Sequence, residues 1–567
     1  MKKLPKIFLF VKLYYIMLNI FKNNKYLILL VIITISTICL TFRHNVGLII
    51  DCGREAYYPQ QILNGEILYK NLFCIYGPFA YLFNAFLYKI FGINLNVLCV
   101  SGSICALGIV VTLFLIAKKL FNEKIAFNFS SIAIAVGIAP TYVFNYSFPY
   151  SFSMTYGLLT FLLSLLFLIN FVCSNKNIYL YLSLFLAGIS ICSKYEFVPY
   201  LLVYFILFWK MKPSLKIIIN SLLSLSFVPM VSFLVLFLQG LNISDIKNSI
   251  SIIITMSKTQ TLKYFYMHCG VIPHKQSIIA LFVTSLCLLI PFIIYMLSIF
   301  LKEKLAKNQV LTLILTYSSI CLILVLKLFK MNDIFMALPI ILAIAVVINY
   351  KKLMNNFVLF LVVLSSILFS LKIFWGLVLN SYGIYYLPLI LIAIAFIFKD
   401  KFSEKDWDYI SFYVLIFALL IGFNNIKTVS NNNICLSTSK GKIYVEKKYE
   451  KTKELLDFIN KNTQKTDEII IFPEGMMINF LSNRKTDGFY NSMIPLYEET
   501  FGVEMFRKHF SKKTPKYIIF NSWNSSDYYF SIICKDYGFD FCKFVQKNYF
   551  EKIKLSGDFS YVVFEKK

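Results

Sequence analysis

Three charged side chains lie within five positions, directly after the first long apolar run of the chain. They are Asp51, Arg54 and Glu55, in the stretch DCGREAYYPQQILNGEILYKN that covers residues 51–71. A carboxylate at a membrane edge is costly to desolvate, so it is a functional candidate by default. The arginine offers a planar fork of hydrogen-bond donors, which a lysine does not. Alternatively, Asp51 caps the following helix and pairs with Arg54 as an interfacial anchor, while Glu55 faces water.

The composition places these charges in an integral membrane protein. Of 567 residues, 58% are hydrophobic and 15% are charged, and the mean hydropathy is +0.70. A soluble domain cannot bury that much apolar surface. The formal net charge of +27 comes mostly from Lys residues in short breaks between apolar runs, as in cytoplasmic loops. We therefore expect membrane lipids, and no nucleic acid, among the partners.

The apolar runs predict a polytopic α-helical membrane protein with about 13 transmembrane helices, since one span needs roughly 20 mainly apolar residues. The fifth, sixth, tenth and twelfth runs are short for a span. The predicted helices are centred near 26–42, 95–117, 125–143, 155–173, 178–193, 197–209, 217–239, 277–300, 309–327, 336–350, 357–379, 384–398 and 409–424.

Charge placement predicts the orientation in the cytoplasmic (inner) membrane. With a cytoplasmic N-terminus, alternate breaks carry the Lys clusters, for example at residues 118–124, 210–216 and 302–307. Positively charged loops stay in the cytoplasm. An odd number of spans then places the C-terminus outside.

Residues 1–424 are predicted to form the transmembrane domain, and residues 425–567 a small extracytoplasmic α/β domain. Polar residues dominate this second part. YVEKKYEKTKELLDFINKN predicts an amphipathic helix, and EIIIFPE, KYIIFN and SYVVFE predict strands. Cys534 and Cys542 could form a disulfide there, with Cys435 left over. No cysteine pair has metal-ligand spacing with a histidine nearby, so no metal site is predicted.

The first outer loop, residues 43–94, is predicted to contain two interfacial helices. Residues 78–91 would span only about 21 Å as a helix, too short for a bilayer core near 30 Å. The segment begins with a proline and is followed by Gly92, which suits a bounded helix. A second helix is predicted over 54–64, ending at a turn with Gly65.

Three stretches resemble the C-type (GT-C) glycosyltransferases. The first-loop pattern is an Asp at the end of the first helix, then DxxR, A…L.NG..LY.N and GP…Y…A.LYK.FG. The other two are AGISICSKYEFVPYLL at 187–202, and IIIFPEGMMINFLSNRKTDGFY followed by PKYIIFN in the C-terminal part. They are similar to the protein O-mannosyltransferase and aminoarabinose transferase clan and to bacterial lipopolysaccharide-core transferases. The resemblance implies a GT-C fold, a polyprenyl-phosphate sugar donor and inversion by a single displacement.

The resemblance also implies roles for individual residues. Asp51 matches the family's first-loop Asp and is expected to be the general base, with Arg54 orienting it or contacting the donor phosphate. Lys194 is expected to meet the donor phosphate, with Glu196 as its partner. Alternatively, Lys194 extends towards lipid headgroups.

Other candidates follow less closely from the pattern. The family often has an acidic residue in the second outer loop, but FNYSFPYSFSM has none, which leaves a divalent cation as an open question. Tyr150 could bond sugar hydroxyls or belong to an aromatic belt. Lys330 and Asp333 are second-rank candidates for donor or sugar contact. Arg484 could meet an anionic acceptor, but we favour a structural role that ties its domain to the membrane part.

The leading hypothesis is therefore a membrane glycosyltransferase that modifies a cell-envelope glycan, lipid or protein. A transporter or flippase of glycolipids is one alternative, although we find no two-fold repeat of segments. A glycan ligase or polymerase is another, although such enzymes usually have their large loop late in the membrane part. A non-catalytic scaffold is the last alternative, if the missing second carboxylate is decisive.

Overall fold

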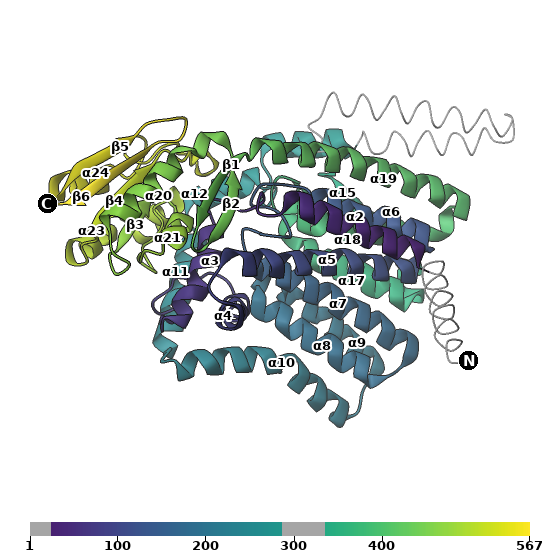
Figure 1. The fold of residues 1–567 in the computed structure, drawn as a ribbon. Coiled ribbons are helices and arrows are strands. Elements are labelled where there is room, and N and C mark those ends of the chain that lie inside the picture. Colours follow the sequence, from purple (N-terminus) through teal and green to yellow (C-terminus); the bar gives the residue numbers. More distant parts are fainter. Residues whose placement is uncertain (1–23, 286–334) are drawn as a thin grey trace, which may run out of the picture.

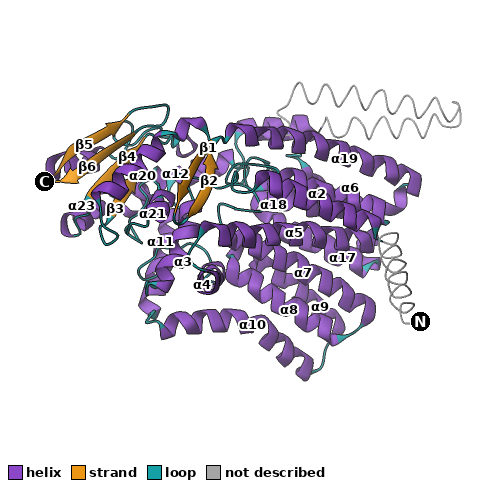
Figure 2. Cartoon of the chain, viewed as in Figure 1, coloured by secondary structure: helices purple, strands orange, loops and turns teal. Residues whose placement is uncertain are grey.

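The computed structural model describes residues 24–285 and 335–567. A bundle of helices forms most of the molecule, and a C-terminal domain containing a sheet lies at one end (Figure 1). The strands are confined to that end (Figure 2). Both parts were predicted. The predicted span at 309–327, most of the span at 277–300, and the candidates Lys330 and Asp333 lie outside the described residues.

Four described helices are long and apolar enough to cross a membrane. They are α5 (Leu95–Leu120), α7 (Phe152–Ser174), α10 (Leu215–Leu238) and α19 (Glu404–Lys427). Several predicted spans correspond to shorter apolar helices, so the predicted number of 13 is not confirmed. These shorter helices are α2 (Lys25–Thr41), α8 (Asn177–Ser193), α15 (Leu338–Ile348), α17 (Phe357–Ser370) and α18 (Gly383–Ile397).

Two predicted spans depart from a regular α-helix, and a proline lies near each departure. The run near 125–143 becomes α6 (Glu123–Ala133) and a wider turn, η1 (Ile134–Ile138), which ends before Pro140. Proline lacks the N–H that would continue the helix. The run near 197–209 begins as a tight turn, η2 (Tyr195–Tyr200), which contains Pro199 and leads into α9 (Leu201–Met211).

Helices of the bundle approach closely where glycine removes a side chain. A Cβ atom at Gly188 of α8 would lie 2.1 Å from the carbonyl oxygen of Leu225 in α10. Small residues allow such backbone approach between membrane helices. The close packing of α8 on α10 fixes the end of α8, where Lys194 follows.

The two predicted helices of the first outer loop are present as α3 (Cys52–Leu63) and α4 (Phe79–Phe91). Helix α4 ends at Gly92, whose φ of 86° favours glycine. It is seen nearly end-on in Figure 1, across the bundle helices, as expected for a helix along a membrane surface. Helix α3 is almost entirely buried, because the C-terminal domain packs on it.

The C-terminal domain begins with a hairpin, β1 (Ile434–Thr438) and β2 (Gly441–Val445), followed by a four-stranded sheet. The sheet order is β3 (Ile469–Phe472), β4 (Tyr517–Asn521), β6 (Tyr561–Lys566) and β5 (Tyr549–Leu555). Strands β3 and β4 are parallel, with Ile469 opposite Tyr517, and the remaining pairs are antiparallel. The carboxyl ends of β3 and β4 therefore lie side by side.

Sequence patterns predicted part of this domain. The predicted amphipathic helix is α20 (Lys451–Asn462), and the three predicted strands are β3, β4 and β6, the first two fully buried. Strands β1, β2 and β5 were not predicted. The remaining helices are α21 (Met476–Ser482), α22 (Pro495–Phe501), α23 (Val503–Lys512) and α24 (Phe539–Asn548).

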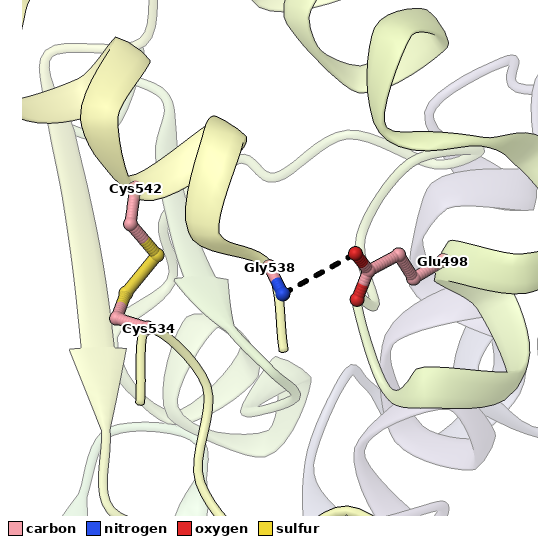
Figure 3. The surroundings of a disulfide bond; sticks show 4 residues. All are labelled: Glu498, Cys534, Gly538 and Cys542. Atoms are coloured by element: carbon pink, nitrogen blue, oxygen red, sulfur yellow. Dashed lines mark hydrogen bonds between the residues drawn. A yellow bond between two sulfur atoms is a disulfide. The ribbon is translucent and has the colours of Figure 1, made fainter. Parts of the chain in front are cut away.

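Cys534 and Cys542 form a disulfide beside α24 (Figure 3). It joins the start of α24 to the preceding loop. A carboxylate oxygen of Glu498, in α22, accepts a hydrogen bond of 3.2 Å from the backbone N–H of Gly538 in that loop. Cys435 is a free, exposed cysteine.

The outer loop after α10 contains α11 (Ile243–Ser257) and α12 (Gln260–His268), and α12 contacts the C-terminal domain. Glu499 of α22 accepts hydrogen bonds from the backbone N–H groups of Gln260 and Thr261, at 2.8 and 3.0 Å. A carboxylate at a helix N-terminus stabilises the helix by satisfying its free N–H groups. This contact ties the two outer elements together.

Candidate active site

Asp51 stands at the turn where the chain enters α3, and its side chain does not cap that helix. Instead, its Oδ1 atom accepts a hydrogen bond from Nη2 of Arg54, at 3.2 Å. The Asp51 backbone has a φ of 56°, which is uncommon for a residue other than glycine and costs about 1–3 kcal/mol. The capping part of the anchor interpretation is therefore wrong, whereas the predicted pairing with Arg54 is present.

Arg54 connects several groups around Asp51. Its Nη2 atom also donates to the carbonyl oxygen of Tyr150, at 3.1 Å, and its guanidinium lies 5.3 Å from the ring centre of Tyr76. Only 12% of its side chain is exposed, against 32% for Asp51. The carboxylate is thus the more accessible member of this ion pair.

Glu55 does not face water, contrary to one expectation. It is fully buried, and its two oxygens accept hydrogen bonds from the Tyr81 hydroxyl, at 2.7 Å, and from the backbone N–H of Phe152, at 2.8 Å. A bond of 3.3 Å from Arg54 completes its contacts. Glu55 therefore holds α3 against α4 and α7.

Lys194 directly follows α8 and is 4% exposed, so it does not extend towards lipid headgroups. Its Nζ atom donates to the hydroxyl of Tyr150 at 2.5 Å and lies 3.1 Å from Oε1 of Glu196. The predicted pairing of Lys194 with Glu196 is thus present. Tyr150 is buried and takes part in the site, rather than in an aromatic belt.

A second lysine, which sequence reasoning missed, shares the same carboxylate. Lys372, in the tight turn η4 (Leu371–Ile373) after α17, lies 2.6 Å from Oε1 of Glu196. Its ammonium is 3.6 Å from the ring centre of Tyr382. Tyr386 donates to the other oxygen of Glu196, at 3.0 Å. Two cations thus share one carboxylate, which leaves a net positive charge suited to an anion.

Tyrosine rings bring this positive group next to Asp51. The Lys194 ammonium lies 5.3 Å from the ring centre of Tyr76, at the same distance as the Arg54 guanidinium. Burial raises the pKa of Asp51 above its ordinary value, and the charges of Arg54 and Lys194 offset only part of that effect. Asp51 is therefore a stronger base than an exposed aspartate and lies beside cationic groups.

The C-terminal domain contributes a carboxylate that sequence reasoning also missed. The backbone N–H of Asp51 donates to Oε1 of Glu474, at 2.9 Å. Burial raises the pKa of Glu474, and the charge of Asp51 raises it further. Glu474 lay within the quoted motif IIIFPEGMM, where its place just after a buried strand was the available signal.

The remaining candidates lie elsewhere. All the nitrogens of the Arg484 side chain bond within the C-terminal domain, to Thr463 and to the carbonyl oxygens of Ser482 and Asn483. Its role there is structural, but it does not tie the domain to the membrane part. No group of three or more His, Cys, Asp or Glu residues that could hold a metal ion occurs in 24–285 and 335–567.

Comparison with known proteins gives a family match for part of the chain and a similar fold. Residues 76–237 match the model of the dolichyl-phosphate-mannose-protein mannosyltransferase family. The fold is similar to the crystal structure of ArnT from Cupriavidus metallidurans bound to undecaprenyl phosphate. The TM-score is 0.50 at 9% identity, over 95% of this chain and 98% of that chain. The family match over residues 76–237 and this similar fold agree with the resemblance to the C-type glycosyltransferases.

A weaker similarity links the chain to the archaeal oligosaccharyltransferase AglB from Archaeoglobus fulgidus, in complex with an inhibitory peptide and a dolichol-phosphate. Its TM-score is 0.44 at 13% identity, over 95% of this chain and 74% of that chain. No curated protein matches the sequence.

Proposed function

We propose that the chain is a GT-C glycosyltransferase that moves a sugar from a polyprenyl-phosphate donor to an acceptor hydroxyl at the outer face of the membrane. The observation that carries this proposal is the position of Asp51, an accessible carboxylate paired with Arg54, beside the shared cluster of Lys194, Glu196 and Lys372. The family match and the similarity to ArnT, whose structure contains undecaprenyl phosphate, support the same reaction class.

In the proposed reaction, an acceptor hydroxyl attacks the anomeric carbon of the donor sugar. The bond between that carbon and the phosphate oxygen breaks, and the phosphate leaves with the electron pair. Asp51 takes the hydroxyl proton, which its raised pKa favours. A single displacement of this kind inverts the anomeric carbon.

The leaving phosphate is expected to bind at the lysine pair. As the bond breaks, negative charge grows on the lipid phosphate, and fixed cations stabilise that charge in a site with little water. Lys194 and Lys372 carry two positive charges against the one negative charge of Glu196. Arg54 is placed to orient Asp51, because it bonds that carboxylate directly.

The acceptor is expected to approach through a cleft of about 800 Å³ between α12 and the C-terminal domain. Its walls include Tyr264, Tyr529 and Phe539, of which the last two are 70% and 49% exposed. Glu498 and Asp536 add carboxylate oxygens. Aromatic faces combined with carboxylates suit a carbohydrate, so we propose that this cleft holds the glycan part of an acceptor.

Tyr528 links this cleft to the site. It precedes Tyr529, and its ring stacks on that of Phe265 in α12, with 4.9 Å between ring centres. Burial raises the pKa of Tyr528, and the charge of Asp51 raises it further, which places the tyrosine near that carboxylate. Tyr528 is therefore adjacent in sequence to a residue of the cleft wall and within electrostatic range of the proposed base.

The proposed topology has the transmembrane domain over 1–424 and the C-terminal domain over 425–567, outside the cytoplasm of an inner membrane. The last long helix, α19, ends at Lys427, and the first strand begins at Ile434, close to that boundary. The disulfide between Cys534 and Cys542 supports an oxidising compartment for this domain.

The test is incubation of the purified protein with polyprenyl-phosphate sugars that carry a label on the sugar. A glycosyltransferase releases lipid phosphate and transfers the label to an acceptor. A transporter or flippase moves intact donor across a vesicle membrane without breaking that bond. A ligase or polymerase, in contrast, requires an oligosaccharide on the lipid. Intact donor after prolonged incubation with envelope acceptors would reject the proposal.

A further inference from the structure

We propose that Glu474 is a positioning residue of the reaction site, through which the C-terminal domain holds Asp51 in the orientation that accepts the proton of the acceptor hydroxyl. This inference rests on the proposed function. It gives the C-terminal domain a direct part in the reaction, and it supplies the second carboxylate that the second outer loop, residues 144–154, lacks.

The backbone around Glu474 is tightly held. The residue follows β3 at the carboxyl edge of the parallel strand pair, the edge at which α/β sheets commonly place functional groups. Its carbonyl oxygen accepts a hydrogen bond of 2.7 Å from the side chain of Asn521, at the end of β4. The neighbouring carbonyl of Pro473 accepts a bond of 2.7 Å from the backbone N–H of Met493. Glu474 is therefore presented from a fixed loop.

The docking of the domain on α3 brings this loop to Asp51. A Cβ atom on Gly53 would lie 2.2 Å from the backbone nitrogen of Met477 in α21, so the two helices meet without an intervening side chain. The Tyr57 hydroxyl accepts a hydrogen bond of 2.9 Å from the backbone N–H of Thr486. Two contacts of the segment that follows Glu474 thus fix its position relative to α3.

The contact between Glu474 and Asp51 explains how Asp51 keeps its unusual backbone. Asp51 precedes the first residue of α3 with a φ of 56°, and Glu474 accepts a hydrogen bond from its backbone N–H. A partly buried N–H without a partner would cost about 1–3 kcal/mol. Glu474 therefore stabilises the turn that points the Asp51 carboxylate towards Arg54.

Charge gives Glu474 a second effect on Asp51. Two carboxylates held this close do not both ionise readily, because each negative charge disfavours the other. The pair retains a proton to higher pH than a lone aspartate would. The charge of Asp51 raises the pKa of Glu474, and by the same interaction a charge on Glu474 increases the proton affinity of Asp51.

The experiment separates these two effects with two substitutions. Glu474→Gln keeps an oxygen for the Asp51 N–H but removes the charge, so we expect the acid limb of the kcat/KM profile to move to lower pH. Glu474→Ala removes both, so we expect kcat to fall about ten-fold or more, with the donor KM within about two-fold of the wild-type value. Glu565→Gln is the matched control in the same sheet, since its partners are Lys552 and Tyr517.

A Glu474→Gln profile that superimposes on the wild-type profile, with kcat retained in Glu474→Ala, would overturn the proposal. If Glu474→Ala fails to fold, the pH profile of Glu474→Gln decides. If the wild-type protein transfers no sugar, the proposed function fails. Infrared titration of the carboxyl groups then tests separately whether Glu474 and Asp51 interact. A protonated-carboxyl band that persists to unusually high pH in the wild type, and is lost in Glu474→Gln, supports the pairing. An unchanged band contradicts it.

Discussion

The backbone N–H of Asp51 lies 2.9 Å from the carboxylate of Glu474, although 423 positions separate the two residues in the chain. One residue belongs to the first outer loop of the membrane part, and the other to the sheet of the C-terminal domain. Both parts of the protein therefore hold Asp51, the proposed general base, in place. Changes that disturb the contact between these parts should affect the reaction, even where they touch no substrate.

Removing either lysine of the cationic cluster should weaken donor binding. Lys194→Ala and Lys372→Ala should each reduce the affinity for polyprenyl phosphate by about ten- to a hundred-fold, because a hydrogen bond to a charged group contributes about 1.5–3 kcal/mol. Labelled lipid phosphate binding to the purified variants measures this effect. Lys210→Ala, an exposed lysine at the end of α9, is the control. If both variants bind polyprenyl phosphate with unchanged affinity, the phosphate does not bind at these two lysines.

The rate of sugar transfer should fall as the pH is lowered. The midpoint of this fall should lie at a higher pH than the pKa of an ordinary aspartate. Asp51 must be ionised to accept a proton, and burial raises its pKa. Activity should therefore be full above the raised pKa and be lost as the pH falls through it, whereas a free aspartate titrates near about 3.9. The dependence of kcat/KM on pH tests this. Full activity down to about pH 4 would contradict a raised pKa.

Widening the contact between α3 and α21 should impair catalysis at a distance. Gly53→Ala would place a methyl group 2.2 Å from the backbone nitrogen of Met477, so the C-terminal domain must shift. Such a displacement moves Glu474 away from Asp51, and a 1 Å error in a reaction site can cost about a hundred-fold in rate. We expect kcat to fall by about ten-fold or more.

Gly422→Ala, in α19, is the control for this substitution. Its new methyl group would lie 3.5 Å from its nearest neighbour, the Cβ atom of Ala135, which is an ordinary contact. Both variants should be compared at equal amounts of folded protein. Equal kcat values for Gly53→Ala and the wild type would show that the domain contact does not govern the reaction.

Truncating an exposed aromatic side chain of the outer cleft should affect the acceptor and spare the donor. Tyr529→Ala removes a ring that is 70% exposed on the cleft wall. We expect transfer to acceptors in isolated envelope membranes to fall by about five-fold or more, since truncating an aromatic side chain that anchors a binding surface commonly costs more than about 1 kcal/mol. Binding of labelled lipid phosphate should not change. A loss of donor binding with normal acceptor use would assign the cleft to the donor instead.

The sequence indicated those site residues that lie close together in the chain, within a short motif at the end of a helix. Asp51 and Arg54 follow the first apolar run, and Lys194 and Glu196 follow the fifth, so their positions at helix ends were readable from hydropathy and motif. Their roles remain predictions. Hydropathy could not predict the irregular turns in the runs near 125–143 and 197–209, because it does not distinguish regular α-helical turns from wider or tighter ones.

The missed residues depend on contacts between distant segments. Lys372 is a single lysine inside the predicted span at 357–379, and its place in the site is evident only when η4 meets Glu196. Glu474 follows a strand whose neighbours come from other parts of the domain, and it meets Asp51 only after the whole domain docks on α3. Glu55 shows the opposite case, since one interpretation of the sequence left it facing water, yet tertiary packing buries it with three hydrogen-bond partners.

The most direct measurement compares wild-type protein and Asp51→Asn for the release of lipid phosphate from a labelled polyprenyl-phosphate sugar in the presence of envelope acceptors. Asparagine keeps the shape of the side chain but cannot take the proton. The wild type should release lipid phosphate and label the acceptor, and the variant should be at least about a hundred-fold slower, with the same melting temperature and the same donor affinity. Near-normal release by Asp51→Asn would contradict the assignment of this carboxylate as the base.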